Sequence, residues 1–146
     1  MQIMNEIIGN KFIVVPVCIW FCIQIFKTVT DLAINKKLNV KRLIGAGGMP
    51  SSHSAVVTSL SVLIGREYGF NSGIFAMALV FAFVVMYDAA GVRRAAGKQA
   101  TILNKLLETP GLTTVQVQEK LVEVLGHTPV QVFVGAIIGV LIGAIV

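Results

Sequence analysis

The chain has 146 residues, of which 55% are hydrophobic and 13% are charged, and its mean hydropathy is +0.83. Soluble domains carry about 25% charged residues, so this composition excludes an ordinary soluble protein and predicts a single integral-membrane domain over residues 1–146. The formal net charge of +5 fits contact with anionic lipid headgroups. We therefore expect membrane lipid, and no nucleic acid, as the partner.

Four apolar stretches predict membrane helices over residues 12–30, 54–68, 73–87 and 129–146. The first lacks the basic segment and cleavage site of a signal peptide, so we expect it to be retained as an anchor. The second has too few uninterrupted apolar residues to cross about 30 Å of hydrocarbon alone. Arg66 can snorkel at one of its ends, and a polar turn can lie in a cavity at the other. The pattern predicts an all-α polytopic membrane bundle with about four transmembrane helices.

The basic residues are distributed unevenly along this pattern. Residues 27–53 and 88–127 would share one membrane face, and they contain ten of the twelve lysines and arginines. An excess of lysine and arginine in short loops marks the cytoplasmic side. We therefore expect an integral protein of the cell membrane with both chain ends outside the cytoplasm.

The longer basic segment has helical periodicity. Residues 93–108 read as an amphipathic helix, and a break follows at 109–111. Thr113 and Gln116 match a capping box, which predicts a second short helix over 115–125. This cytoplasmic helical hairpin either lies on the membrane surface or folds beneath the bundle.

The segment Gly47-Gly48-Met49-Pro50-Ser51-Ser52-His53-Ser54-Ala55 stands at the start of the second apolar stretch. Pro50 near a helix start, a serine N-cap at Ser51 or Ser52, and uncapped amides behind them form a ready anion site. His53 adds a titratable group. The alternative is a glycine-rich turn with an ordinary cap.

Polar residues also lie at the ends of other spans. Gln24, Lys27 and Asp31 form one polar stripe on the first helix. We expect this stripe to face the bundle interior or an aqueous cavity. The alternative is that Lys27 snorkels and pairs with Asp31. Asp88 closes the third span. The basic residues that follow it are interleaved with alanines and glycines, which indicates a cationic surface pressed against another helix. These basic residues are Arg93, Arg94 and Lys98.

The chain has two histidines, and each opens an apolar span. His53 begins the second and His127 precedes the fourth. In the predicted topology both lie on the membrane face that holds Lys27, Arg93 and Arg94. Two histidines among cations and two helix N-termini predict a phosphate-ester site.

These residues resemble a known family. The string 50–54 resembles the Pro-Ser-Gly-His motif of the type 2 phosphatidic acid phosphatases, which are related to the vanadium haloperoxidases. Residues 127–136 resemble the last motif of that superfamily. Residues 47–55 and 87–100 are still more similar to a divergent branch of small membrane proteins, and this likeness covers nearly the whole chain.

The resemblance implies a role for each matching residue. His127 would be the nucleophile that forms a phosphohistidine, and His53 the general acid for the leaving alkoxide. Serines and cations would hold the phosphoryl oxygens. No cofactor and no metal are expected. The phosphate-binding set comprises Lys27, Ser51, Ser52, Arg93, Arg94 and Lys98.

The chain departs from the motif at two positions. Gln131 stands where the family has an acid four residues after the nucleophile, and Leu121 stands where it has an arginine. Glutamine orients an imidazole but does not stabilise imidazolium as a carboxylate does. Asp88 or Glu123 would have to compensate from elsewhere.

The leading hypothesis is hydrolysis or transfer of the phosphate of a phosphorylated lipid. The alternative is a non-catalytic binder or carrier of such a lipid on the same scaffold. A purely structural membrane subunit does not explain polar residues that converge on one face. A bundle of four helices is thin, which favours a homodimer.

Overall fold

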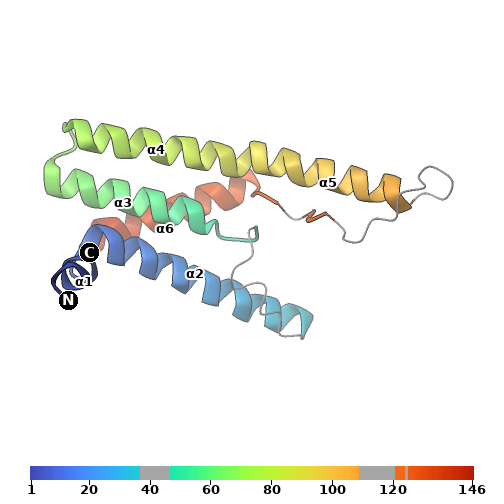
Figure 1. Ribbon diagram of the computed structural model, residues 1–146, viewed down its shortest axis with the longest axis horizontal. Helices are drawn as coiled ribbons and strands as arrows, with labels where there is room; N and C mark the ends of the chain where they lie inside the picture. The colour runs from blue at the N-terminus through green and yellow to red at the C-terminus, as the bar shows by residue number, and fades with distance from the viewer. Residues whose placement is uncertain (37–46, 109–120, 124) are drawn as a thin grey trace.

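The computed structural model describes residues 1–36, 47–108, 121–123 and 125–146, and all its regular elements there are helices (Figure 1). The predicted all-α class is confirmed. The four apolar stretches fold as four of these helices, while the short N-terminal helix was not predicted. In chain order they are α1 (Gln2–Ile8), α2 (Lys11–Asn35), α3 (Ser52–Tyr68), α4 (Gly73–Ala90), α5 (Val92–Glu108) and α6 (Pro129–Ile145).

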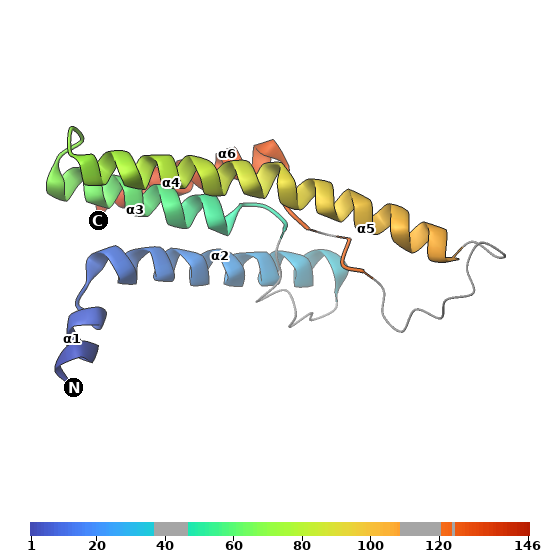
Figure 2. The same cartoon turned by 45° about the horizontal axis from the view of Figure 1, so that its top comes forward.

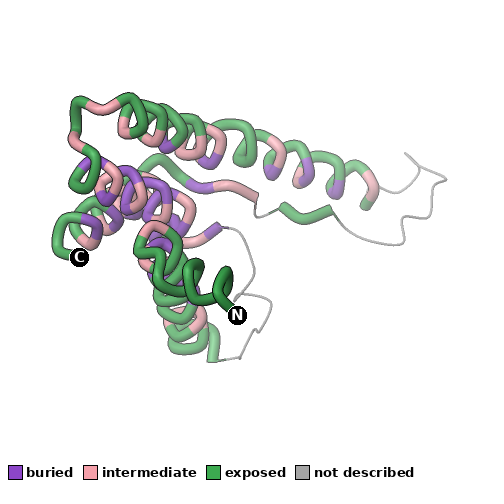
Figure 3. Tube along the Cα trace, turned by 60° about the vertical axis from the view of Figure 1, so that its left-hand side comes forward, coloured by how far each residue is buried: buried purple, intermediate pink, exposed green. Residues whose placement is uncertain are grey.

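The bundle is built around α3, which packs against α2, α4 and α6. In Figures 1 and 2, α3 and α6 run in the same direction, and α2 and α4 run in the opposite one. α5 continues the line of α4 beyond the bundle. Buried residues concentrate on α3 and on the faces that meet it, whereas α1 is exposed throughout (Figure 3).

Side-chain caps begin the four bundle helices. Asn10, Ser51, Ser72 and Thr128 each accept a hydrogen bond from a backbone N–H of the first helical turn. Thr128 and Gln131 bond reciprocally as a capping box with Pro129 at the first helical position. Such caps satisfy amides that the helix leaves without partners.

Three glycines bring the backbones of α6 and α3 into contact. Gly135, Gly139 and Gly143 are buried and recur at every fourth position on α6. A Cβ at Gly135 would overlap the carbonyl oxygen of Ser51, and one at Gly139 would overlap the Thr58 side chain. The Thr58 hydroxyl donates to the Ala136 carbonyl at 3.1 Å. Small residues at this spacing allow close helix packing in membranes.

Two helices among the described residues are long and apolar enough to cross a membrane. They are Lys11–Asn35 and the nearly continuous α4–α5 helix, Gly73–Glu108; α6 is apolar but shorter. The outer face of α2 exposes large apolar side chains such as Phe21 and Ile25, each 55% exposed. Such a surface is suited to lipid rather than to water.

Charged and aromatic contacts close the bundle end that lies near the chain termini. Lys11 pairs with Glu67 at 2.6 Å, and the neighbouring rings of Phe12 and Tyr68 stack with centroids 5.7 Å apart. The Arg66 guanidinium, expected to snorkel, donates to the Gly143 carbonyl at 2.9 Å. Arg66 therefore also joins α3 to α6.

The amphipathic helix predicted over 93–108 is present as α5, but the second helix of the hairpin is not found where it is described. Residues 121–123 and 125 are not helical, and residues 115–120 and 124 lie outside the described residues. The Asn104 amide explains the difference, because it binds both the N–H and the carbonyl of Leu121. At Gly97 the absence of a side chain admits the backbone of Glu123 and Leu125.

Gly139→Ala is expected to lower the free energy of unfolding by about 1–3 kcal/mol, because the added methyl group overlaps backbone and side-chain atoms of α3. Thermal unfolding of the purified protein in detergent measures the change. Gly73→Ala is the matched control, since a Cβ there meets nothing within 4 Å. Equal stability of the two variants would contradict the close α3–α6 contact.

Candidate functional site

The two histidines meet at one end of the bundle. Because α3 and α6 run in parallel, their N-termini lie at the same end, and each carries a histidine there. The rings of His53 and His127 have centroids 5.9 Å apart and are inclined by 65°. The predicted grouping of the histidines at one end of the bundle is therefore observed.

His127 is 2% exposed and is held by two neighbours. Its backbone N–H donates to the Ala89 carbonyl at the end of α4, at 2.8 Å. Its Nδ1 lies 3.2 Å from the Gln131 Oε1, which also accepts the Thr128 N–H at 3.0 Å. The Gln131 oxygen is an acceptor, so the His127 Nδ1 carries the hydrogen and Nε2 carries the lone pair.

The Nε2 atom of His127 is buried, and no hydrogen-bond partner for it is found among the described residues. The same holds for the Nδ1 atom of His53. Burial lowers the pKa of His127 from its ordinary value of 6.5, and nearby Lys27 and His53 add to this, while the bond to Gln131 and the neighbouring backbone of Gly48 oppose it. His127 is accordingly a neutral imidazole at pH 7, with an available lone pair on Nε2.

The serines form the rear of the site. Ser51 is fully buried, and its hydroxyl accepts the N–H and the hydroxyl of Ser54 at 3.3 and 3.0 Å. The Ser51 N–H donates to the Gln131 carbonyl at 3.0 Å, which ties the start of α3 to α6. Ser51 is thus the N-cap of α3, as one of the two predicted alternatives required. Ser52 is buried beside it at 3% exposure.

Lys27 enters the site from α2. It is 5% exposed, and its Nζ donates to the Gly47 carbonyl at 3.1 Å. The alternative in which Lys27 snorkels to the surface is therefore wrong. A positive charge buried this deeply is costly unless other groups, or a bound anion, compensate it.

Arg93 and Asp88 form a pair on the His53 side of the site. The Arg93 Nε donates to Asp88 Oδ2 at 2.7 Å, and both side chains are roughly half-exposed. Arg93, Lys27 and Asp88 all lie within Coulombic range of His53. Asp88 thus neutralises an arginine, while the partner of the His127 Nδ1 is Gln131.

A polar pocket of about 310 Å³ opens beside His127. It brings together four of the predicted residues and a loop glycine, whereas Ser51 and Ser52 do not line it. The pocket is lined by Gly48, Arg94, Lys98, Glu123, His127 and Gln131, among others. Two cations and a buried imidazole favour an anion in this pocket, while the one acid in its lining, Glu123, is bound by Thr101 and Asn104.

Sequence reasoning missed the residues that position the far wall of this pocket. Glu123 accepts hydrogen bonds from Thr101 at 3.1 Å and from Asn104 at 2.8 Å. The residues missed are Thr101 and Asn104. Asn104 is only 4% exposed, and buried amides require partners, but this burial arises from tertiary packing, which the sequence alone does not show. No cluster of three His, Cys, Asp or Glu side chains that could hold a metal is found in the described part of the chain.

Similarity to known proteins identifies the family of this chain. The profile of the Divergent PAP2 family matches residues 8–142. The chain belongs to this family. It is also 41% identical over 130 residues to the membrane protein YuiD of Bacillus subtilis (strain 168), with 82% of each chain covered. No solved structure matches it significantly. The family match confirms the resemblance to the divergent branch that residues 47–55 and 87–100 indicated, and the relative supports a membrane protein.

The lowered pKa of His127 predicts acid sensitivity. The unfolded chain takes up this proton near pH 6.5 while the folded protein resists it, so stability is lost as the pH falls below about 6.5. Melting temperatures measured in detergent between neutral and mildly acidic pH should fall in the wild type. They should fall less in His127→Gln; an identical decline in both would contradict a neutral, buried His127.

Proposed function

We propose that this member of the Divergent PAP2 family is a membrane phosphatase or phosphotransferase that acts on a lipid phosphate through a phosphohistidine. The observation that carries the proposal is the His127 imidazole. Its Nδ1 is bound by Gln131, and its Nε2 is buried without a described partner beside a second histidine and a cationic pocket. A nucleophile requires such a free lone pair in a defined direction.

In the first step, His127 Nε2 forms a bond to phosphorus while the bond from phosphorus to the ester oxygen breaks. His53 enters this step as the imidazolium and donates a proton to the departing alkoxide, which leaves as an alcohol and leaves His53 neutral. In the second step, water attacks the phosphohistidine, and His53 accepts a proton from that water. Phosphate is released and both histidines return to their starting states. An alcohol in place of water completes a transfer.

The charge of the phosphoryl group is matched by nearby cations. Arg94 and Lys98 line the pocket with His127, and Lys27 is buried close to both histidines. The N-termini of α3 and α6 point to the same place, and helix N-termini favour anions. We assign Arg93 a supporting role, because Asp88 already occupies its Nε.

The alternative function is a binder or carrier of a phosphorylated lipid, and Gln131 is the observation that favours it. Gln131 orients the imidazole, but it adds no negative charge to stabilise the cationic phosphoimidazole. In catalytic triads, replacing the corresponding acid by an amide costs a large part of the rate, about 10⁴-fold in one protease. The phosphate pocket would persist in a binder.

His127→Ala separates the two functions. The enzyme hypothesis predicts that this variant releases no phosphate from a panel of lipid phosphates, while vanadate still stabilises it thermally because the cations and helix amides remain. Phosphate release by the purified protein and melting temperature are the two measurements. Robust turnover in His127→Ala would reject the nucleophile, and absence of turnover in the wild type would favour the binder.

Two arginine variants test the phosphate-binding part of the proposal. Arg94→Gln should reduce vanadate stabilisation strongly, since Arg94 lines the pocket. Arg93→Gln should reduce it less, since that side chain is paired with Asp88. Equal and full stabilisation in both variants would remove these arginines from the phosphate site.

We further propose that the site faces the cytoplasm, on the basis of the excess of basic residues in segments 27–53 and 88–127, which contribute the residues of the site. A cysteine introduced by Lys105→Cys, with Cys18 and Cys22 replaced by alanine, should resist an impermeant maleimide until the cells are lysed. Asn71→Cys, on the turn at the opposite end of the bundle, should react in intact cells. The reverse pattern would overturn the orientation.

A further inference from the structure

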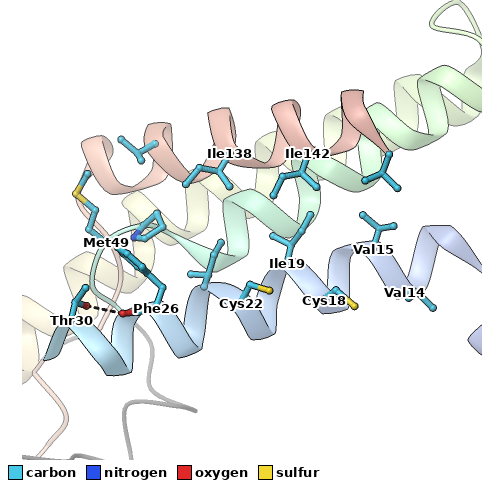
Figure 4. Close-up of a pocket in the computed structure, with 14 residues that line it drawn as sticks. Val14, Val15, Cys18, Ile19, Cys22, Phe26, Thr30, Met49, Ile138 and Ile142 are labelled. Atoms are coloured by element: carbon cyan, nitrogen blue, oxygen red, sulfur yellow. Dashed lines mark hydrogen bonds between the residues drawn. The ribbon is translucent and has the colours of Figure 1, made fainter. Parts of the chain in front are cut away.

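A long apolar groove separates α2 from α6. Its volume is about 820 Å³, and one wall is formed by α2 between Val14 and Thr30. The α6 wall carries Val134, Ile138 and Ile142. Figure 4 shows Ile138 and Ile142 facing α2 across the groove. Ile19 and Ile23, which are buried against Ala55 of α3, close its floor.

The groove offers almost no polar partner to an occupant. Four of its lining side chains contain sulfur or oxygen, and the others are hydrocarbon. The four are Cys18, Cys22, Thr30 and Met49. The Thr30 hydroxyl already donates to the carbonyls of Phe26 and Lys27, the first of which is drawn in Figure 4. Apolar cavities of this kind do not hold ordered water, so an occupant of this groove is expected to be apolar.

One end of the groove adjoins the phosphate pocket. Gln131, Val134, Ile138 and Ile142 follow one another at helical spacing on the same face of α6. The first of these binds His127, and the other three line the groove. On the facing side, Gly48 lines the polar pocket, while Met49 and Pro50 line the groove. A ligand in the groove therefore ends beside His127.

The shape and lining of the groove suit an extended hydrocarbon chain. The α2 wall from Val14 to Thr30 is about 24 Å long at 1.5 Å per residue. One membrane leaflet is about 15 Å deep, so a lipid chain can lie along the groove over its whole length. The groove is apolar and adjoins a pocket lined by Arg94 and Lys98. A hydrocarbon chain with an anionic head matches both parts.

We propose that the α2–α6 groove holds a hydrocarbon chain of the lipid whose phosphate binds beside His127. This assignment rests on the proposed function and adds that the substrate is a long-chain lipid phosphate rather than a small soluble ester. The chain lies along α2 and α6, and its polar end reaches Gln131 and the cationic pocket. Chain contacts then select the substrate, while the histidine pocket acts only on its phosphate.

The test uses a phosphatidic acid with a photoreactive diazirine in its acyl chain, added to the protein in phosphatidylcholine nanodiscs. Cross-links should map to residues 14–30 and 134–146, and should exceed those of a phosphatidylcholine with the same diazirine. Cys22→Trp fills the groove and should reduce the phosphatidic acid cross-links by about tenfold. Ile138→Trp should do the same from the opposite wall, which guards against a local folding defect.

Ile25→Trp is the matched control, because Ile25 lies on α2 at a similar depth but is 55% exposed and outside the groove. It should cross-link as the wild type does. Undiminished phosphatidic acid cross-linking in both Cys22→Trp and Ile138→Trp would overturn the groove assignment. A change of oligomeric state in Cys22→Trp but not in Ile25→Trp would assign the groove to a second copy and would also overturn it.

Vanadate stabilisation is measured on the same variants and reports on the phosphate pocket separately. Stabilisation should be unchanged in Cys22→Trp, because the groove residues do not line that pocket. Retained vanadate binding without selective cross-linking would reject the groove alone. If vanadate does not stabilise the wild type, the phosphate site is rejected, and both proposals are rejected with it.

Discussion

The close approach of α3 and α6 is the constraint on which the rest of this structure depends. Three glycines on α6 allow its backbone to lie against Ser51, Thr58 and neighbouring residues of α3. The two helices run in parallel, so their N-termini are brought to the same level. This level is where His53 and His127 meet. A larger residue at any of the three glycines would separate the helices and, with them, the histidines.

His127 is held by three helices. The end of α4 accepts its N–H, the first turn of α6 orients its ring, and Asn104 of α5 anchors the segment that leads to it. The contact with Gln131 is local, whereas the contacts with Ala89 and through Asn104 join distant parts of the chain. Local capping and tertiary packing together position the imidazole, which is the condition for a preorganised reactive group.

The sequence predicted those parts of the protein that depend on local patterns. Apolar stretches located the four bundle helices, and the serine cap located the start of α3. The helix predicted for the end of the hairpin is absent at residues 121–123 and 125. There the Asn104 side chain binds the backbone of Leu121, which is a contact between distant residues. The pairing of Asp88 with Arg93 and the burial of Lys27 depend on how helices pack, which spacing along one helix does not reveal.

The four bundle helices differ in length, and this difference sets the depth of the site. α3 and α6 have 17 residues each, whereas α2 has 25. At 1.5 Å per residue, the shorter helices span about 26 Å, less than a typical hydrocarbon core of about 30 Å. α2 continues from Lys27 to Asn35, about 12 Å beyond the level of the buried amine. In a bilayer matched to α2, the two histidines lie at the bottom of a recess below the level of the headgroups, unless the surrounding membrane thins to meet the short helices.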